Sequence, residues 1–259
     1  MRGSRMNELN QAVCWVTGAA GGIGKAVCSL IMANGGHLVV SDANEEKLYE
    51  LCEELKNEQT QILPIVLDVS DQQEVRLAGE KIESTFGRLD VLVNGAGISP
   101  KGENGRILVE DMDPAIWRKV LDINLNGTFY CSQVAVKLMK KHKKGHIVNI
   151  ASSAGRTYSP ITGAHYAASK AAMISLTRQL AGEVGPDGIY VNAVAPGRID
   201  TPMIWDVASE VNENAANNTP LRRLGTPDEV AKAIGFLISE QSSFITGAVI
   251  DVNGGRFMV

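Results

Sequence analysis

The chain has 259 residues, of which 44% are hydrophobic and 21% are charged. This length suits one large α/β domain or two small ones, and we expect one, because no linker, low-complexity tract or internal repeat marks a boundary. The formal net charge of −4 gives no broad attraction to nucleic acid or to an anionic membrane, so the expected partners are small molecules or copies of the same chain.

The terminus, the cysteines and the histidines argue against export and against a metal site. No apolar run approaches the roughly 20 residues needed to span a bilayer, and residues 1–6 lack the apolar core of a signal peptide. The four cysteines form no C-x-x-C motif, and the four histidines show no metal-ligand spacing, which argues against a zinc-dependent alcohol dehydrogenase. We expect a cytoplasmic protein without a metal, with residues 1–5 as a disordered leader left from expression and residues 6–259 as the folded domain.

Short β-branched runs alternate with helical stretches along the chain. The nearly continuous apolar character of these runs is typical of parallel strands that helices cover on both faces. The sequence therefore predicts a doubly wound (Rossmann) α/β fold with a seven-stranded parallel sheet, and long helices at roughly 114–139 and 164–182. The expected strands are 12–17, 37–41, 62–67, 89–93, 146–150, 189–194 and 248–251.

A glycine-rich turn follows the first expected strand, as Thr17-Gly-Ala-Ala-Gly-Gly-Ile-Gly24. Glycines let the backbone approach a pyrophosphate, whose charge the N-terminus of the following helix stabilises. Such a turn by itself can simply be tight, but its position between a strand and a helix favours a dinucleotide site.

An acidic residue, Asp42, ends the second expected strand, 18 residues after Gly24. A carboxylate there accepts hydrogen bonds from the adenosine ribose and repels a 2′-phosphate. The chain has Ala20, Gly21 and Ala43 where a basic residue would favour NADP. We therefore expect NAD as the cofactor.

A tyrosine and a lysine, Tyr166 and Lys170, are four residues apart and so share one face of a helix. A neighbouring ammonium would lower the pKa of the phenol from about 10, which would make Tyr166 a general acid or base. The alternative is a packed tyrosine beside a lysine whose stem lies along apolar surface. His165 points about 100° away from Tyr166, and we interpret it as a packing or substrate-pocket residue.

A polar stretch with four asparagines, at about 200–219, is too long for an ordinary connection between a strand and a helix. It is either a lid or a disordered loop, and we prefer a lid over a pocket.

Six motifs in the same order resemble the short-chain dehydrogenase/reductase family, from about residue 12 to 255. They are the Thr17–Gly24 turn, Asn94-Gly-Ala-Gly97, Asn124 within Asp122-Ile-Asn-Leu-Asn126, Ser152, Tyr166-Ala-Ala-Ser-Lys170 and Pro196-Gly197. The resemblance implies that Tyr166 exchanges a proton with the substrate oxygen, which Ser152 holds. It also implies that Lys170 binds the nicotinamide ribose and lowers the pKa of Tyr166, and that Asn124 anchors a proton-relay water.

The catalytic serine is ambiguous because two serines are adjacent. The family's Ser-x-x-Gly spacing to Gly155 selects Ser152, whereas counting back thirteen residues from Tyr166 selects Ser153. We choose Ser152 because it fits the strand-end motif Asn149-Ile-Ala-Ser.

The resemblance further implies which residues contact the cofactor. Asp68 and Val69 would meet the adenine, although Asp68 could instead cap a helix. Asn94 and Gly97, which would line the cleft, could merely shape a turn. The full expected set is Gly18, Gly22, Ile23, Gly24, Asp42, Asp68, Val69, Asn94, Ala96, Gly97, Tyr166, Lys170, Pro196, Gly197, Ile199 and Thr201.

The substrate pocket is expected to form from 98–106, 156–165 and the lid, since these segments follow strands whose ends hold the cofactor. Lys101 and Arg106 could bind an anionic substrate, and Thr157, Tyr158, Ser159 and Thr162 a hydroxylated one, or this polarity could be that of ordinary solvated loops. We expect an NAD-dependent oxidoreductase that interconverts a secondary alcohol and a carbonyl on a small polar substrate, such as a polyol, a sugar or a hydroxy acid.

Two other functions remain open. One is an NADPH-dependent 3-oxoacyl-thioester (acyl carrier protein) reductase, against which Asp42 and the missing basic residue argue. The other is a nucleotide-binding sensor without activity, because a fold does not establish a function. The resemblance also implies a homotetramer that packs through the two long helices and the C-terminal strand.

Overall fold

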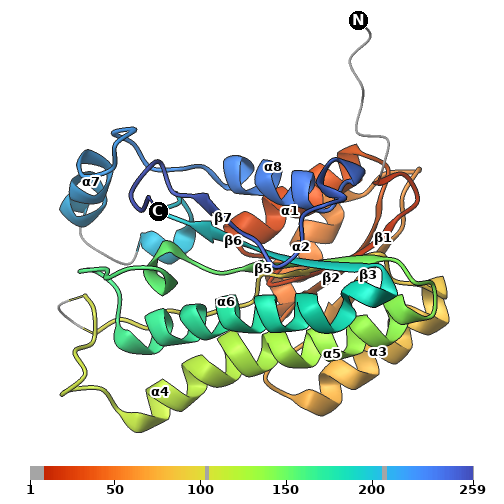
Figure 1. Ribbon diagram of the computed structural model, residues 1–259, viewed down its shortest axis with the longest axis horizontal. Coiled ribbons are helices and arrows are strands. Elements are labelled where there is room, and N and C mark those ends of the chain that lie inside the picture. The colour runs from red at the N-terminus through yellow and green to blue at the C-terminus, as the bar shows by residue number, and fades with distance from the viewer. Residues whose placement is uncertain (1–8, 103–104, 206–208, 259) are drawn as a thin grey trace, which may run out of the picture.

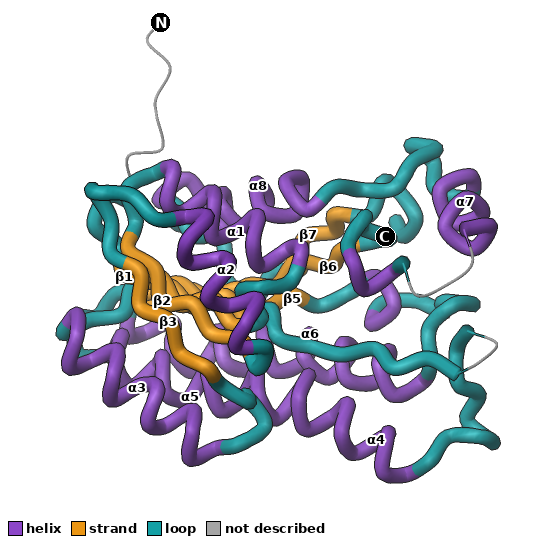
Figure 2. The backbone as a smooth tube through the Cα atoms, turned by 180° about the vertical axis from the view of Figure 1, so that it is seen from behind, coloured by secondary structure: helices purple, strands orange, loops and turns teal. Residues whose placement is uncertain are grey.

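Seven parallel strands form one sheet in the computed structural model, which describes residues 9–102, 105–205 and 209–258 (Figure 1, Figure 2). The spatial order of the strands is β3-β2-β1-β4-β5-β6-β7, which confirms the predicted doubly wound fold. Their bounds are β1 Val13–Thr17, β2 His37–Asp42, β3 Ile62–Val66, β4 Val91–Asn94, β5 Gly145–Ile150, β6 Ile189–Pro196 and β7 Val249–Val252. The order reverses between β1 and β4, and ligands of such sheets bind at that reversal, outside the carboxyl ends of the strands.

Helices cover both faces of the sheet, with α1, α2 and α8 on one face and α3, α5 and α6 on the other (Figure 1). The helix bounds are α1 Gly22–Ala33, α2 Glu45–Leu55, α3 Gln72–Phe86, α4 Pro114–Leu121, α5 Gly127–Lys140, α6 Ala164–Val184, α7 Ser209–Asn217 and α8 Pro227–Leu237. Among the described residues, no helix is long and apolar enough to cross a bilayer, and no cluster of His, Cys, Asp and Glu could hold a metal ion.

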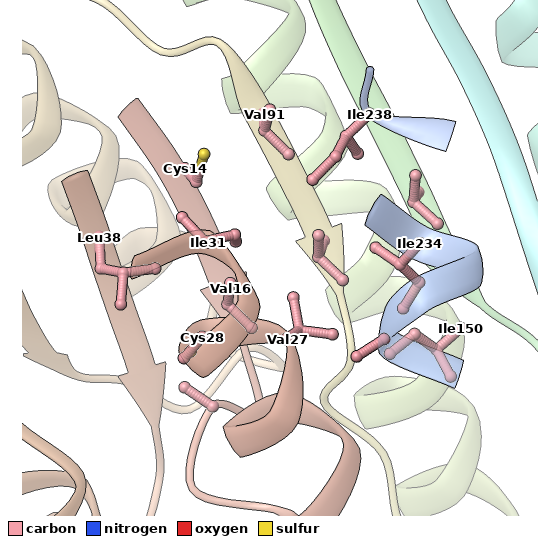
Figure 3. Packing of buried hydrophobic residues seen from close by; sticks show 14 of the residues in the cluster. Cys14, Val16, Val27, Cys28, Ile31, Leu38, Val91, Ile150, Ile234 and Ile238 are labelled. Carbon is pink, nitrogen blue, oxygen red and sulfur yellow. The ribbon is translucent and has the colours of Figure 1, made fainter. Parts of the chain in front are cut away.

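The strand β1 shows why both faces must be covered. Its side chains alternate, so that Cys14 and Val16 belong to the core under α1 and α8, and Val13 and Trp15 to the core over α3, α5 and α6. Figure 3 shows the first core, where α1, α8 and the strands meet. Because these side chains are almost fully buried, the sheet is rigid and its carboxyl edge can hold a site in a fixed geometry.

The predicted helix 114–139 is interrupted. After α4 comes a π-helical segment, Asp122–Asn126, before α5 begins. Here the side chain of Asn124 accepts a hydrogen bond from the N–H of Ile98 at 2.8 Å and donates one to its carbonyl at 3.0 Å. The spacing of apolar residues could not predict this insertion, because it accompanies a contact with a loop distant in sequence.

The predicted lid contains a 3₁₀ turn, Pro202–Ile204, followed by α7. It is thus partly helical rather than an irregular loop, although residues 206–208 lie outside the described residues, as does the expected leader 1–5. The helix α7 lies at the same end of the molecule as the C-terminus in both views (Figure 1, Figure 2).

Candidate active site

A cleft of about 610 Å³ lies at the carboxyl edge of the sheet. Its wall comes from the glycine turn after β1, the ends of β2, β4, β5 and β6, the N-terminal part of α6 and the 3₁₀ turn of the lid. Of the expected site residues, all but Asn94 and Asn124 line it.

The glycine turn leaves no room for a side chain at Gly18 or at Gly24. Gly18 has a φ of +64°, and a Cβ on Gly24 would lie 2.2 Å from the carbonyl oxygen of Gly18. The N-cap of α1, Gly21, brings no side-chain cap, and the first turn holds no acidic residue. The first N–H groups of α1 therefore face the cleft without a competing carboxylate, as a bound pyrophosphate requires.

Asp42 lies beside this turn at the end of β2. Its Oδ2 accepts a hydrogen bond from the N–H of Ala20 at 3.1 Å, and its Oδ1 accepts one from the N–H of Asn44 at 3.0 Å. The carboxylate is thus held at the cleft wall by two backbone groups. Lys47, which sequence reasoning did not single out, lines the same part of the cleft from the first turn of α2.

Asp68 and Val69 follow β3 and also line the cleft. Oδ1 of Asp68 accepts hydrogen bonds from the N–H and the hydroxyl of Ser70 at 2.9 and 2.7 Å. The cap of α3 is Asp71, which accepts from the N–H groups of the first turn, so Asp68 is not the helix cap that the sequence allowed.

Tyr166, Lys170 and Ser152 meet in the middle of the cleft. The ammonium of Lys170 lies 5.6 Å from the centre of the Tyr166 ring, one turn away on α6. It also donates a hydrogen bond to the carbonyl of Ile150 at 2.6 Å. The side chain of Ser152, at the end of β5, is hydrogen-bonded to the phenol of Tyr166. Among the described residues, Ser153 shows no such bond, although it also lines the cleft.

The pKa values of this pair correct the sequence-based expectation. Burial raises the pKa of Tyr166, and the hydrogen bond with Ser152 lowers it by a smaller amount. Burial also lowers the pKa of Lys170 to about 8. The predicted lowering of the Tyr166 pKa by Lys170 is therefore wrong in this structure, because desolvation of the phenolate dominates.

Asn124 lies directly behind the cleft and is fully buried. Besides Ile98, its amide contacts Ser169 on α6, to which it donates at 3.1 Å, and its main-chain carbonyl accepts from the hydroxyl of Thr128 at 2.9 Å. A Cβ on Gly97 would lie 3.2 Å from the Asn124 side-chain oxygen. Asn124 thus links the loop after β4 to α6.

Asn94 does not line the cleft, contrary to the expectation. It is only 2% exposed and donates to Ser132 at 3.1 Å and to Asn149 at 2.8 Å. Asn149 in turn donates to Thr177 at 2.9 Å. This chain of buried polar groups joins β4, β5, α5 and α6 behind the site, while Ala96 and Gly97 line the cleft itself.

The segment after β6 closes the cleft on its far side. Pro196, Gly197, Ile199 and Thr201 line it as expected. A Cβ on Gly22 would lie 2.7 Å from Cγ2 of Thr201, so this segment packs against the glycine turn.

The expected substrate loops contribute only in part. Ser159 and Thr162 line the cleft, but Arg106 and Tyr158 do not. The guanidinium of Arg106 donates to the Tyr158 hydroxyl at 2.9 Å outside the cleft. Of the two residues suggested for an anionic substrate, Lys101 lines the cleft and Arg106 does not.

His165 is fully buried, and its Nδ1 accepts a hydrogen bond from the N–H of Tyr166 at 2.6 Å. Burial lowers the pKa of its imidazole. His165 does not line the cleft, so of its two predicted roles, in packing or in the substrate pocket, the structure favours packing. Sequence reasoning missed four charged residues that line the cleft, namely Lys47, Lys119, Arg198 and Arg256. Of these, only Arg198 could have been expected from the sequence, because it directly follows the Pro196-Gly197 motif.

The fold and this site define a dinucleotide-dependent oxidoreductase, and the chain belongs to the short-chain dehydrogenase/reductase family. The family model described as "Enoyl-(Acyl carrier protein) reductase" matches residues 18–256. As a member of this family, the chain is an oxidoreductase that uses a nicotinamide cofactor.

The relatives of this chain narrow the class of substrate. The chain is 40% identical to the 3-oxoacyl-[acyl-carrier-protein] reductase of Thermotoga maritima, over 96% of this chain and 98% of that protein. A crystal structure of the 3-oxoacyl-[acyl-carrier protein] reductase of Brucella melitensis matches with a TM-score of 0.92 and 42% identity, covering 98% of this chain and 94% of that one. A second Brucella melitensis structure of this kind, with bound NAD, matches with a TM-score of 0.91 and 41% identity, over the same shares. These findings overturn the expectation of a polyol, sugar or hydroxy acid as substrate and favour the thioester reductase.

Proposed function

We propose that this protein reduces a 3-oxoacyl thioester to the 3-hydroxyacyl thioester, with NADH as the reductant. The observation that carries this proposal is the trio Ser152, Tyr166 and Lys170 in the cleft of a chain whose near full-length relatives are named 3-oxoacyl-[acyl-carrier-protein] reductases. The nicotinamide, when bound, supplies the hydride that adds to the carbonyl carbon. The protein then has to orient the carbonyl, deliver one proton to its oxygen and stabilise the charge that develops there.

The protonation states suit reduction. Because burial raises the pKa of Tyr166, the phenol keeps its proton at neutral pH and can donate it to the oxygen that becomes the alcohol. Ser152 donates a hydrogen bond to the same oxygen in this proposal. Lys170, with a pKa of about 8, is mostly protonated at pH 7 and holds the nicotinamide ribose. Asn124 anchors the water through which Tyr166 regains its proton.

The preference for NADH rests on Asp42, whose carboxylate faces the adenosine part of the cleft. A 2′-phosphate there would meet a like charge. Lys47 is the competing observation, since its ammonium lines the same region. We give Asp42 more weight because two backbone N–H groups hold it in place, whereas Lys47 is an exposed, flexible side chain.

The cofactor proposal is tested by fluorescence titration with NADH and NADPH. The variant Asp42→Asn keeps an oxygen for the N–H of Ala20 but removes the charge, so the preference for NADH over NADPH should fall about 10-fold. Lys47→Gln is the matched variant and should leave that ratio unchanged. Tighter binding of NADPH than of NADH by the unmodified protein would contradict the proposal.

The reaction is tested at 340 nm with NADH and three substrates: the 3-oxobutanoyl thioester of N-acetylcysteamine, the corresponding 2-butenoyl thioester, and a set of polyols with NAD. We expect turnover of the 3-oxo compound alone. Reduction of the 2-butenoyl thioester instead would assign an enoyl reductase, and NADH binding without turnover of any substrate would assign a sensor.

Assembly and location are further proposals. The side chains of Trp117 on α4 and Phe129 on α5 are 36% and 44% exposed, which supports packing of these helices against another copy. We propose a cytoplasmic homotetramer with the segment 200–219 as a substrate lid. Light scattering after size exclusion tests the assembly.

A further inference from the structure

Two arginines line the cleft and form no ion pair with any acidic residue that the structure describes. Arg198 follows β6, and Arg256 follows β7. The strands β6 and β7 pair at their ends through Pro196 and Val252, so the segments that follow them bring Arg198 and Arg256 to the same end of the cleft. The charge of Arg256 is also, after burial, the next cause of the lowered pKa of Arg198. Two like charges brought together beside a cleft repel each other unless an anion lies between them.

The surrounding hydrogen bonds do not neutralise this pair. Nε and Nη2 of Arg198 donate to the amide oxygen of Asn212 on α7, at 2.9 and 2.6 Å, and that oxygen carries no formal charge. The nearby carboxylate of Asp251 on β7 is already paired with Arg156 at 2.9 Å. Among the described residues, no ion pair involves either Arg198 or Arg256, so the cleft holds two positive charges in excess at this point.

The position of the pair separates it from the adenosine part of the cleft. Neighbouring strands lie about 4.8 Å apart, so Arg198, after β6, is one strand or about 5 Å from the strand that carries Ser152. Asp42, after β2, is four strands away, or about 19 Å. An anion between the two arginines would therefore lie on the side of the reacting carbonyl, not at the adenosine.

We propose that Arg198 and Arg256 form an anion-binding subsite that takes a carboxylate or phosphate group of the substrate. This inference rests on the proposed function and adds a substrate property to it: the 3-oxoacyl compound carries a negative group within reach of its carbonyl. Arginine suits this role because its planar guanidinium binds carboxylate and phosphate oxygens in pairs. Asn212 positions Arg198 by holding the other edge of its guanidinium and, through its amide N–H, the carbonyl of Ile204 at 3.1 Å.

The test compares three compounds with the same reacting carbonyl. The 3-oxobutanoyl thioester of N-acetylcysteamine is neutral, 3-oxobutanoate carries a carboxylate, and 3-oxobutanoyl coenzyme A carries phosphates. We expect Arg256→Gln to lower kcat/KM at least 10-fold for one or both anionic compounds, and less than twofold for the neutral thioester. The compound that loses most identifies the anion as carboxylate or phosphate.

Controls separate this role from a structural one. Arg256→Lys keeps the charge and should restore part of the loss, and Arg118→Gln, which removes an exposed charge on α4, should change nothing. The Kd for NADH should be the same in Arg256→Gln as in the unmodified protein. Equal losses for all three compounds, or a weaker NADH complex, would overturn the proposal. If circular dichroism shows that Arg256→Gln is unfolded, Arg256→Met, which keeps an apolar stem, replaces it.

Failure of the subsite and failure of the proposed reaction are distinguishable. If none of the three compounds reacts, the thioester reductase is wrong, but binding of 3-oxobutanoate and of inorganic phosphate to the NADH-saturated protein can still be measured by calorimetry. A 10-fold weaker Kd for either anion in Arg256→Gln would support the subsite, and equal binding by the two proteins would overturn it.

Discussion

The two halves of the cleft are built in different ways. Around β1, β2 and β3, the wall is mostly backbone: Gly18 and Gly24 bring main-chain atoms within contact, and Asp42 is held by N–H groups. Around β5, β6 and β7, the wall is made of side chains, among them Tyr166, Lys170 and Arg198. In the first half, Gly18 and Gly24 cannot accept added atoms, whereas the second half can change its chemistry one side chain at a time. This division suits a site whose backbone half holds a common cofactor and whose side-chain half adapts to different substrates.

The largest effect is expected in the side-chain half. Tyr166→Phe removes the hydroxyl that donates the proton to the substrate oxygen, so the rate of reduction at 340 nm should fall about 1,000-fold. Binding of NADH should change less than twofold, because the ring remains. Tyr49→Phe, the same change on a tyrosine that is 48% exposed on α2, should leave the rate of reduction and NADH binding unchanged. Retained turnover in Tyr166→Phe would refute its role as the acid.

The buried ammonium of Lys170 should make stability depend on pH. Its pKa is lowered from 10.5 to about 8, so between these values the unfolded chain binds more protons than the folded one, and stability rises with pH. Relative to Lys170→Met, the free energy of unfolding of the unmodified protein should increase by up to about 3 kcal/mol from pH 8 to pH 10.5. Urea titrations of both proteins measure this difference. Both contain Tyr166, whose raised pKa affects them alike, and parallel pH profiles would contradict the prediction.

The backbone half should reject a single methyl group. In Gly24→Ala the new Cβ would lie 2.2 Å from the carbonyl oxygen of Gly18, so the turn must shift, at a cost of about 1–3 kcal/mol in stability and with weaker NADH binding. Gly182→Ala is the matched control on α6, where a Cβ meets nothing within 4 Å. There the better helix propensity of alanine should stabilise the protein by up to about 1 kcal/mol. Thermal unfolding compares Gly24→Ala with Gly182→Ala. An equal change in stability in the two variants would contradict the distinction between the backbone half and the side-chain half of the cleft.

The smallest effect is expected at the lid. Asn212→Ala removes the oxygen that accepts from Arg198 and the amide that donates to Ile204, at a cost of about 1 kcal/mol. Hydrogen exchange should accelerate in α7 and stay unchanged in α3. Asn214→Ala removes an exposed amide from the same helix and serves as the control. Equal hydrogen-exchange rates of α7 in Asn212→Ala and Asn214→Ala would show that the hydrogen bonds between Asn212 and Arg198 do not hold α7 in place.

Sequence patterns predicted the parts of the site that local geometry determines. The glycine turn, Asp42 at the end of β2, and Tyr166 with Lys170 on one face of α6 all follow from strand ends and helix spacing. The expected substrate was wrong because Asp42 was given too much weight. A carboxylate near the adenosine affects the choice of cofactor and says nothing about the substrate, because Ser152 and Tyr166 lie in another part of the cleft, with Ser152 three strands away from Asp42.

The remaining features required the tertiary structure, since they depend on residues that only folding brings together. Asn94 is buried, and its amide nitrogen donates to Ser132 and Asn149 behind the cleft, so the residue does not line the cleft. The pKa of Tyr166 is set by burial, which no spacing reports. Arg198 and Arg256, in the segments after β6 and β7, become neighbours only when these two strands pair. The sequence alone determined the fold class, the dinucleotide turn and the tyrosine–lysine pair, because helix and strand periodicities are local. The tertiary structure decided which charged groups lie close together in the cleft, which groups are buried and which side chains form hydrogen bonds. These features depend on distances between segments that the chain order does not specify.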